Sequence, residues 1–302
     1  MNYTEETALF ACAGDTLLGI LAKPETPAET GVIVIVGGPQ YRVGSHRQFV
    51  LLSRALAAAG YTVLRFDYRG MGDSTGTQRD FTDVSADVSA ALDVLQKSAP
   101  SVQRVVLWGL CDGASAALIY CQQTRDPRVS GLCLLNPWVR SEASQARTQV
   151  KYYYTQRVMQ REFWAKLLRG GVAMNALAGL LRSVRVAFGV KQRSSIAISS
   201  QGGSLPFQLG MAMGWETFKG NILLLLSDDD YTAKEFLEYS STEVTWKNVM
   251  GHSQLTRHDL QGADHTFSSQ GTRDLVMMLT LGWLKSSASE RPLPASVVEK
   301  AD

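Results

Sequence analysis

Short apolar runs and amphipathic stretches alternate along the first half of the chain. Residues 32–36 (Val-Ile-Val-Ile-Val) form a continuous β-branched run, which is typical of a strand buried on both faces. Similar runs predict strands at 62–67, 104–108 and 131–135, and the stretches beside them predict helices at 47–59, 83–97 and 113–124. Ahead of them, residues 7–12 and 17–22 flank a Gly-Asp turn and predict a β-hairpin. This order predicts an α/β fold with a mostly parallel central sheet and helices on both faces.

The alternation stops after Pro137. Residues 139–216 have a mostly helical pattern without a buried-strand run, and they predict an inserted helical cap, or lid. The sheet pattern then resumes, with strands predicted at 222–226 and 255–260 and helices at 233–239 and 271–285. We therefore predict an α/β core made of residues 1–138 and 217–285, a cap at 139–216 and a loose tail at 286–302.

Composition and charge exclude several classes of protein. Hydrophobic residues make up 45% of the chain, charged residues 19%, and the net charge is +2, which is ordinary for a globular domain and gives no global argument for nucleic-acid binding. The four cysteines have no metal-ligand spacing, so no metal or other cofactor is expected. No signal peptide and no apolar run of about 20 residues is visible, and we expect a cytoplasmic protein with reduced thiols.

The strongest chemical motif is Gly109-Leu110-Cys111-Asp112-Gly113, which follows a predicted strand and opens an Ala-rich helix. A G-x-nucleophile-x-G element in this context forms a tight elbow that presents its central side chain, here the Cys111 thiol. The glycines are needed because larger side chains would collide in so sharp a turn. The alternative interpretation is a buried structural cysteine beside two packing glycines.

Ser74 offers a competing nucleophile, because Gly72-Asp73-Ser74-Thr75-Gly76 also fits G-x-S-x-G. This segment neither follows a strand directly nor opens a helix, so the context that the motif requires is missing. We therefore favour Cys111 over Ser74.

A nucleophile of this kind needs a base, an acid and donors for an oxyanion. His265 lies in a loop between the last predicted strand and the last helix, which makes it the best of four histidines for the base. The acid is expected where the strand at 222–226 ends, at Asp228, Asp229 or Asp230, although carboxylates there also cap helices. The backbone N–H groups of Gly38 and Asp112 are the expected oxyanion donors.

The order Cys111, acid, His265 resembles the α/β-hydrolase superfamily, and residues 67–74 match its D-x-R-G-x-G-x-S loop. More narrowly, residues 37–47, 109–113 and 227–233 look like the type 1 hydrolase associated with the exosortase A system of exopolysaccharide-producing bacteria. That resemblance places the acid at Asp230 and leaves Asp228 where the family usually has glycine. A cysteine nucleophile in this fold also resembles dienelactone hydrolases, and Val36 stands where most α/β-hydrolases have histidine.

Two classes of function follow from these residues. The first is an acyl hydrolase acting on an ester, thioester or lactone of a small acyl-bearing substrate, or an acyltransferase with the same covalent intermediate. The second is a non-catalytic scaffold with the same fold. Neither the acyl group nor the oligomeric state is defined by the sequence.

Basic residues are concentrated in the predicted cap. The predicted cap carries eleven basic and three acidic residues, a net charge of +8, whereas the rest of the chain is acidic. Apolar residues between 172 and 188 are spaced as on one face of a helix, with Arg182 and Arg185 on the other side. Two interpretations stay open: a lid with a solvated basic face, or a surface that contacts an anionic membrane or polymer.

Overall fold

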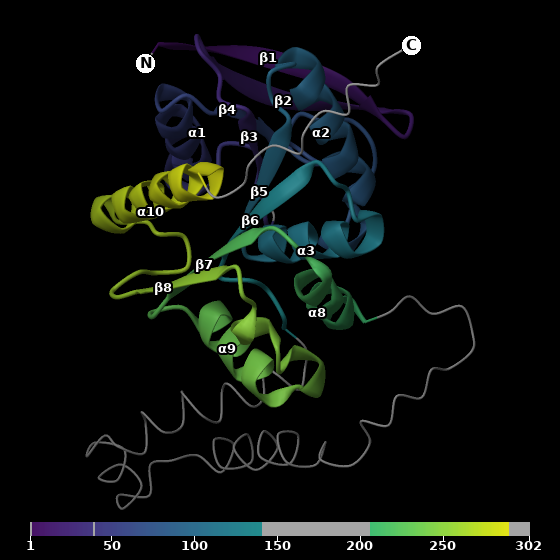
Figure 1. The fold of residues 1–302 in the computed structure, drawn as a ribbon. Helices are drawn as coiled ribbons and strands as arrows, with labels where there is room; N and C mark the ends of the chain where they lie inside the picture. The colour runs from purple at the N-terminus through teal and green to yellow at the C-terminus, as the bar shows by residue number, and fades with distance from the viewer. Residues whose placement is uncertain (1, 39, 141–205, 290–302) are drawn as a thin grey trace, which may run out of the picture.

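The computed structural model describes residues 2–38, 40–140 and 206–289 (Figure 1). The strands are β1 (Tyr3–Cys12), β2 (Asp15–Pro24), β3 (Thr30–Ile35), β4 (Thr62–Phe66), β5 (Arg104–Leu110), β6 (Val129–Leu135), β7 (Asn221–Ser227) and β8 (Leu255–Leu260). The α-helices are α1 (Gln48–Ala58), α2 (Ser85–Ser98), α3 (Asp112–Thr124), α8 (Phe207–Thr217), α9 (Tyr231–Thr242) and α10 (Gln270–Ser289). Short 3₁₀ turns lie at Ser45–Arg47, Phe81–Asp83, Val244–Trp246 and Val249–Gly251.

Within these described ranges, eight strands form one sheet in the order β1-β2-β4-β3-β5-β6-β7-β8. The first three of these, β1, β2 and β4, pair antiparallel, and every pairing from β4 to β8 is parallel. The predicted hairpin and mostly parallel sheet are therefore confirmed. Because the central strands run parallel, their carboxyl ends meet at one edge of the sheet, which is where ligands bind in such folds.

Both faces of the central sheet are covered by helices (Figure 1). Along β3, Ile33 and Ile35 pack toward α2 and α3, while Val32 and Val34 pack toward α1 and α10. Successive residues of a strand point to opposite faces, so a strand covered on both sides is apolar throughout. This explains why the strands at the centre of the sheet are continuous hydrophobic runs.

Two segments differ from the sequence-based boundaries. The helix α8 packs closely against α3, and Met211, Ala212 and Trp215 are buried in the same core cluster as the sheet. The predicted cap extended to residue 216 and so included most of this helix, which the structure places against the core. Residues 286–289, predicted as part of a loose tail, continue α10. The rest of the predicted cap at 141–205, including its basic stretch at 172–188, and the tail at 290–302 lie outside the described residues.

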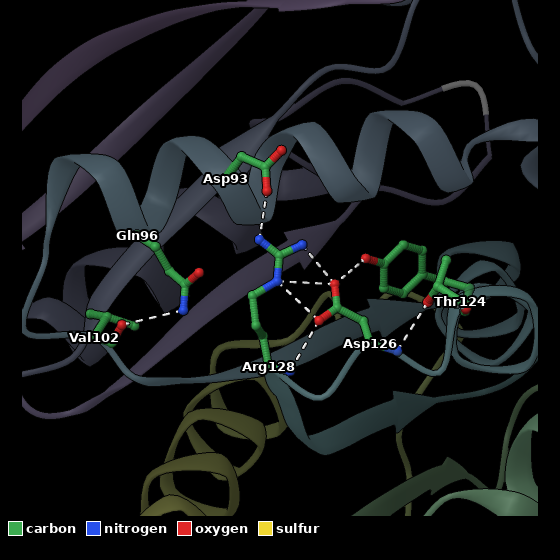
Figure 2. A network of polar contacts seen from close by, with 7 residues as sticks. Asp93, Gln96, Val102, Thr124, Asp126 and Arg128 are labelled. Atoms are coloured by element: carbon green, nitrogen blue, oxygen red, sulfur yellow. Dashed lines mark hydrogen bonds and ion pairs between the residues drawn. The ribbon is translucent and has the colours of Figure 1, made fainter. Parts of the chain in front are cut away.

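A polar network holds the end of α3 that is remote from Cys111 (Figure 2). Arg128 lies between two carboxylates, 2.5 Å from Asp93 of α2 and 2.7 Å from Asp126 in the loop after α3. The hydroxyl of Tyr120, on α3 itself, donates a hydrogen bond to Asp126 at 2.7 Å. Because these groups join α2, α3 and the start of β6, they fix the helix that begins directly after Cys111.

No helix in the described part of the chain has both the length and the apolarity needed to span a membrane.

Candidate active site

Cys111 lies in a sharp turn between β5, which ends at Leu110, and α3, which begins at Asp112. Its backbone angles, φ 60° and ψ −127°, belong to a conformation that residues with a side chain rarely adopt. The neighbouring glycines permit the turn: a Cβ on Gly109 would lie 2.5 Å from backbone atoms of Gly113, and one on Gly113 would lie 2.4 Å from the carbonyl oxygen of Ile35. This geometry matches the elbow that the motif predicts.

The four cysteines differ in accessibility. The side chains of Cys12, Cys121 and Cys133 are buried, whereas that of Cys111 is half-buried. Burial raises the pKa of each of the three buried thiols, to about 12 for Cys121. Only Cys111 therefore combines access to solvent with a position at a helix N-terminus, where backbone N–H groups favour an anion.

The structure brings His265 and Asp230 together at the carboxyl edge of the sheet. The Nδ1 atom of His265 lies 2.8 Å from Oδ2 of Asp230, which is 6% exposed. The same carboxylate accepts hydrogen bonds from the N–H groups of Thr232 and Ala233, at 3.0 and 3.2 Å, and so caps α9. The two roles considered for this acidic stretch, helix cap and histidine partner, are both filled by Asp230.

The electrostatic environment favours the protonated form of His265. Its pKa is raised to about 10, first by the hydrogen bond to Asp230 and then by the Cys111 side chain, against the opposing effect of burial. An imidazole with so high a pKa carries a positive charge at neutral pH. The hydrogen bond between His265 and Asp230 thus lies in a site whose electrostatics Cys111 also influences.

A second buried network, which the sequence analysis did not identify, holds the loop that carries His265. Asn136, fully buried after β6, donates from Nδ2 to Ser227 Oγ at 2.9 Å and to the His265 carbonyl at 3.2 Å. Its Oδ1 accepts from the Ser227 N–H at 2.9 Å, and Ser227 Oγ donates to the Asp264 carbonyl at 2.9 Å. The sequence feature that could have identified Asn136 is an asparagine directly after a buried strand, at the edge where Asp230 also lies.

One of the two predicted oxyanion donors already has a partner within the protein. The Gly38 N–H donates to Oδ1 of Asp112. The backbone N–H groups of Gly38, Gly113 and Asp112 lower the pKa of this carboxyl, against the larger effect of burial, which raises it. The Asp112 side chain is thus the acceptor of the Gly38 N–H in this structure.

The other candidate residues lie in different surroundings. Ser74 donates to the Asp67 carbonyl at 2.8 Å and accepts from the Leu18 N–H at 2.9 Å, so its hydroxyl joins β2 to the loop after β4. Asp228 and Asp229 are exposed, and their N–H groups bond to the carbonyls of Leu260 and Ala263. Over the part of the chain that the structure describes, no group of three His, Cys, Asp or Glu side chains is placed to hold a metal ion.

Known structures with the same fold cover nearly all of this chain. The esterase Pf2001 of Pyrococcus furiosus superposes with a TM-score of 0.63 at 16% identity, over 94% of this chain and 92% of that one. The α/β hydrolase GrgF of Penicillium sp. sh18 gives a TM-score of 0.62 at 17% identity, over 94% and 99% of the two chains. At such low identity these likenesses establish the fold alone.

Sequence comparison adds shorter matches. An uncharacterized protein of Rickettsia prowazekii is 30% identical over 124 residues, which are 41% of this chain and 51% of that protein. The lysophosphatidylserine lipase ABHD12 of Mus musculus is 32% identical over 127 residues, which are 41% of this chain and 31% of the lipase. The chain thus spans about half or less of the relatives that it matches. The model of the family described as serine aminopeptidase, S33, matches residues 28–178, which is half of the chain. With its eight-stranded sheet and its structural neighbours, this chain belongs to the serine aminopeptidase S33 family, within the α/β-hydrolase superfamily.

Proposed function

We propose that this protein is an acyl hydrolase in which Cys111 is the nucleophile, His265 the proton carrier and Asp230 the residue that orients His265. One observation carries the proposal: a half-buried thiol lies at a strand-to-helix elbow and helps to raise the pKa of an imidazole that is 2.8 Å from a buried carboxylate. A nucleophile, a base and a group that orients the base are the three parts that nucleophilic catalysis requires.

The resting site in this proposal is a thiolate beside an imidazolium. The raised pKa of His265 favours transfer of the thiol proton to the imidazole. Cys111 is the N-cap residue of α3, and the N-terminus of a helix favours a negative charge there. Asp230 keeps the imidazolium in place through Nδ1, so that Nε2 is left to face the sulfur and the leaving group.

The reaction proceeds in two halves. The Cys111 thiolate attacks the acyl carbon, the carbonyl π bond opens to an oxyanion, and its collapse expels an alkoxide or thiolate that takes the proton from His265. The neutral imidazole then removes a proton from water, the hydroxide attacks the thioester, and the acid and the Cys111 thiolate are released with His265 again protonated. Each proton that leaves His265 returns to it, so the cycle closes without a cofactor.

The substrate class that we propose is an ester, thioester or lactone of a small acyl-bearing molecule. An acyl-cysteine intermediate is a thioester, which is itself reactive, so an acceptor other than water would make the same site an acyltransferase. The esterase and lipase among the relatives support ester chemistry in this fold. The resemblance of residues 37–47 and 227–233 to the exosortase-associated hydrolases leads us to propose a role beside exopolysaccharide assembly.

Selective alkylation tests the nucleophile before any substrate is known. At pH 6 we expect iodoacetamide to modify Cys111 much faster than Cys12, Cys121 or Cys133, because those three are buried. The variant Cys121→Ala is the matched control and should keep the fast phase, while Cys111→Ala should lose it. Slow, equal labelling of all four thiols would contradict the proposal and favour the scaffold.

The reaction class is tested by turnover. A panel of p-nitrophenyl esters, acyl-CoA thioesters and lactones is compared between the native protein and Cys111→Ala. Hydrolysis by the native protein alone, with an acyl adduct detected on Cys111 by mass spectrometry, is the expected result. Turnover that survives in Cys111→Ala would exclude Cys111 as the nucleophile.

A further inference from the structure

The carboxylate of Asp112 occupies the place that the proposed mechanism assigns to the substrate oxyanion. Its Oδ1 accepts the N–H of Gly38, which is one of the two donors expected to bind the oxyanion. The N–H groups of Gly113 and Asp112 also favour the charged form of this carboxyl. A carboxylate oxygen at the Gly38 N–H has the kind of charge that the oxygen of the tetrahedral intermediate carries.

The absence of a side chain at Gly37 leaves room for the Asp112 carboxylate. Gly37 lies directly against it: a Cβ on Gly37 would be 2.5 Å from Oδ1 of Asp112 and 2.2 Å from the carbonyl oxygen of Leu110. The carboxylate therefore fills the space that the missing Gly37 side chain leaves open. A substrate oxygen and the Asp112 oxygen cannot occupy this space together, since each needs the Gly38 N–H.

The surroundings of Asp112 act on its pKa in both directions. Burial is the largest influence on its pKa and raises it, the Asp80 carboxylate acts in the same direction, and the three N–H groups act in the other. The negative charge of Asp112 also helps to raise the pKa of the buried Tyr68 hydroxyl, after burial itself. The groups that interact with the Asp112 carboxylate are thus two further acids, Asp80 and Tyr68, and backbone N–H donors.

We propose that Asp112 is a specificity-determining residue of this site: its carboxylate holds the Gly38 N–H of the oxyanion hole, every acyl substrate has to displace it, and groups with a negative charge beside the reacting carbon are rejected. The inference rests on the proposed role of Cys111. Displacement breaks hydrogen bonds to a charged group, and a like charge close by in a half-buried site is repelled. The site therefore discriminates against anionic acyl groups and favours neutral or cationic ones.

Alkylation of Cys111 by two reagents of the same size tests the inference without requiring turnover. Iodoacetate carries a carboxylate beside its reacting carbon, and iodoacetamide carries a neutral amide there. The ratio of their rate constants is measured in the native protein, Asp112→Ala and Asp112→Asn. We expect Asp112→Ala to raise the iodoacetate-to-iodoacetamide ratio by about tenfold or more, since the charge is removed and the Gly38 N–H is freed. Asp112→Asn should raise the ratio less, because its amide oxygen still occupies the hole.

The matched control is Asp229→Ala, which removes the same charge from an exposed residue next to Asp230 and should change the ratio less than about twofold. An unchanged ratio in both Asp112 variants, or an equal rise in Asp229→Ala, would overturn the inference. Turnover of p-nitrophenyl acetate is the second readout: its kcat/KM should rise in Asp112→Ala, and a fall together with an unchanged ratio would also overturn it. Failure of the proposed function is seen separately, as slow alkylation of Cys111 by iodoacetamide in the native protein.

Discussion

Asn136 joins three structural elements, and its replacement by alanine should damage both stability and activity. The side chain lies after β6, bonds to Ser227 at the end of β7 and reaches the carbonyl of His265 in the loop after β8. Asn136→Ala removes all three hydrogen bonds at once. The substitution leaves the Ser227 N–H and the His265 carbonyl without these partners in the interior.

The magnitude follows from these two groups. A buried polar group left unpaired costs about 1–3 kcal/mol, so two of them predict a loss of about 2–6 kcal/mol in the free energy of unfolding. Asn136 also has a positive φ of 43°, which asparagine tolerates better than alanine, so the backbone adds about 1 kcal/mol. We therefore expect Asn136→Ala to lose about 3–7 kcal/mol.

Asn136→Gly separates the two contributions. It removes the same hydrogen bonds, but glycine adopts a positive φ without strain, so it should be about 1 kcal/mol more stable than Asn136→Ala. Urea unfolding followed by tryptophan fluorescence measures both variants, and hydrolysis of an ester substrate reports whether His265 is still held. A loss below about 1 kcal/mol in Asn136→Ala would refute the network as described. So would an unfolding energy of Asn136→Gly below that of Asn136→Ala.

Four variants test the same geometry. Cys111→Ser should fold normally and lose most of its hydrolytic activity, since a hydroxyl ionises far less readily than a thiol. Ser74→Ala should keep the acyl-enzyme step, because the Ser74 hydroxyl bonds to backbone groups of β2 and of the loop after β4; loss of the acyl adduct in Ser74→Ala would contradict this. Gly113→Ala should cost about 3 kcal/mol or fail to fold, because its Cβ would meet the Ile35 carbonyl at 2.4 Å, and normal thermal stability would count against the elbow geometry. The raised pKa of His265 predicts that the stability it contributes is complete below about pH 6.5 and is lost as the pH rises toward about 10. The difference in unfolding energy between the native protein and His265→Gln should therefore shrink from pH 6 to pH 10, and a difference that grows would exclude the raised pKa.

The sheet was predictable because its central strands are buried on both faces. Such strands must be apolar at every position, and runs such as 32–36 and 222–226 stand out for that reason. The placement of α8 was not predictable in this way. Met211 and Trp215 make one face of this helix apolar, but an apolar face alone does not say whether it covers the core or the underside of a cap.

The pairing of His265 with Asp230 was predictable from chain order, because both residues follow strands whose carboxyl ends share one edge. The bonds of Asn136 were not, since they depend on the relative register of β6, β7 and the loop after β8. The position of the Asp112 carboxylate was not predictable from the sequence either. The motif placed its N–H group, but only the approach of the Gly38 turn to α3 determines where its carboxylate finds donors.

The position of Asp112 constrains the order of events in the proposed reaction. When the Cys111 thiolate attacks, its negative charge moves to the carbonyl oxygen, and that oxygen needs the Gly38 N–H, which now bonds to Asp112. Two negative charges about 4 Å apart in such a half-buried site repel each other by about 4 kcal/mol, enough to slow the attack about a thousandfold. The carboxylate must therefore leave the hole, or accept a proton there, before or during the attack. The site therefore selects a substrate that displaces the Asp112 carboxylate or allows it to accept a proton.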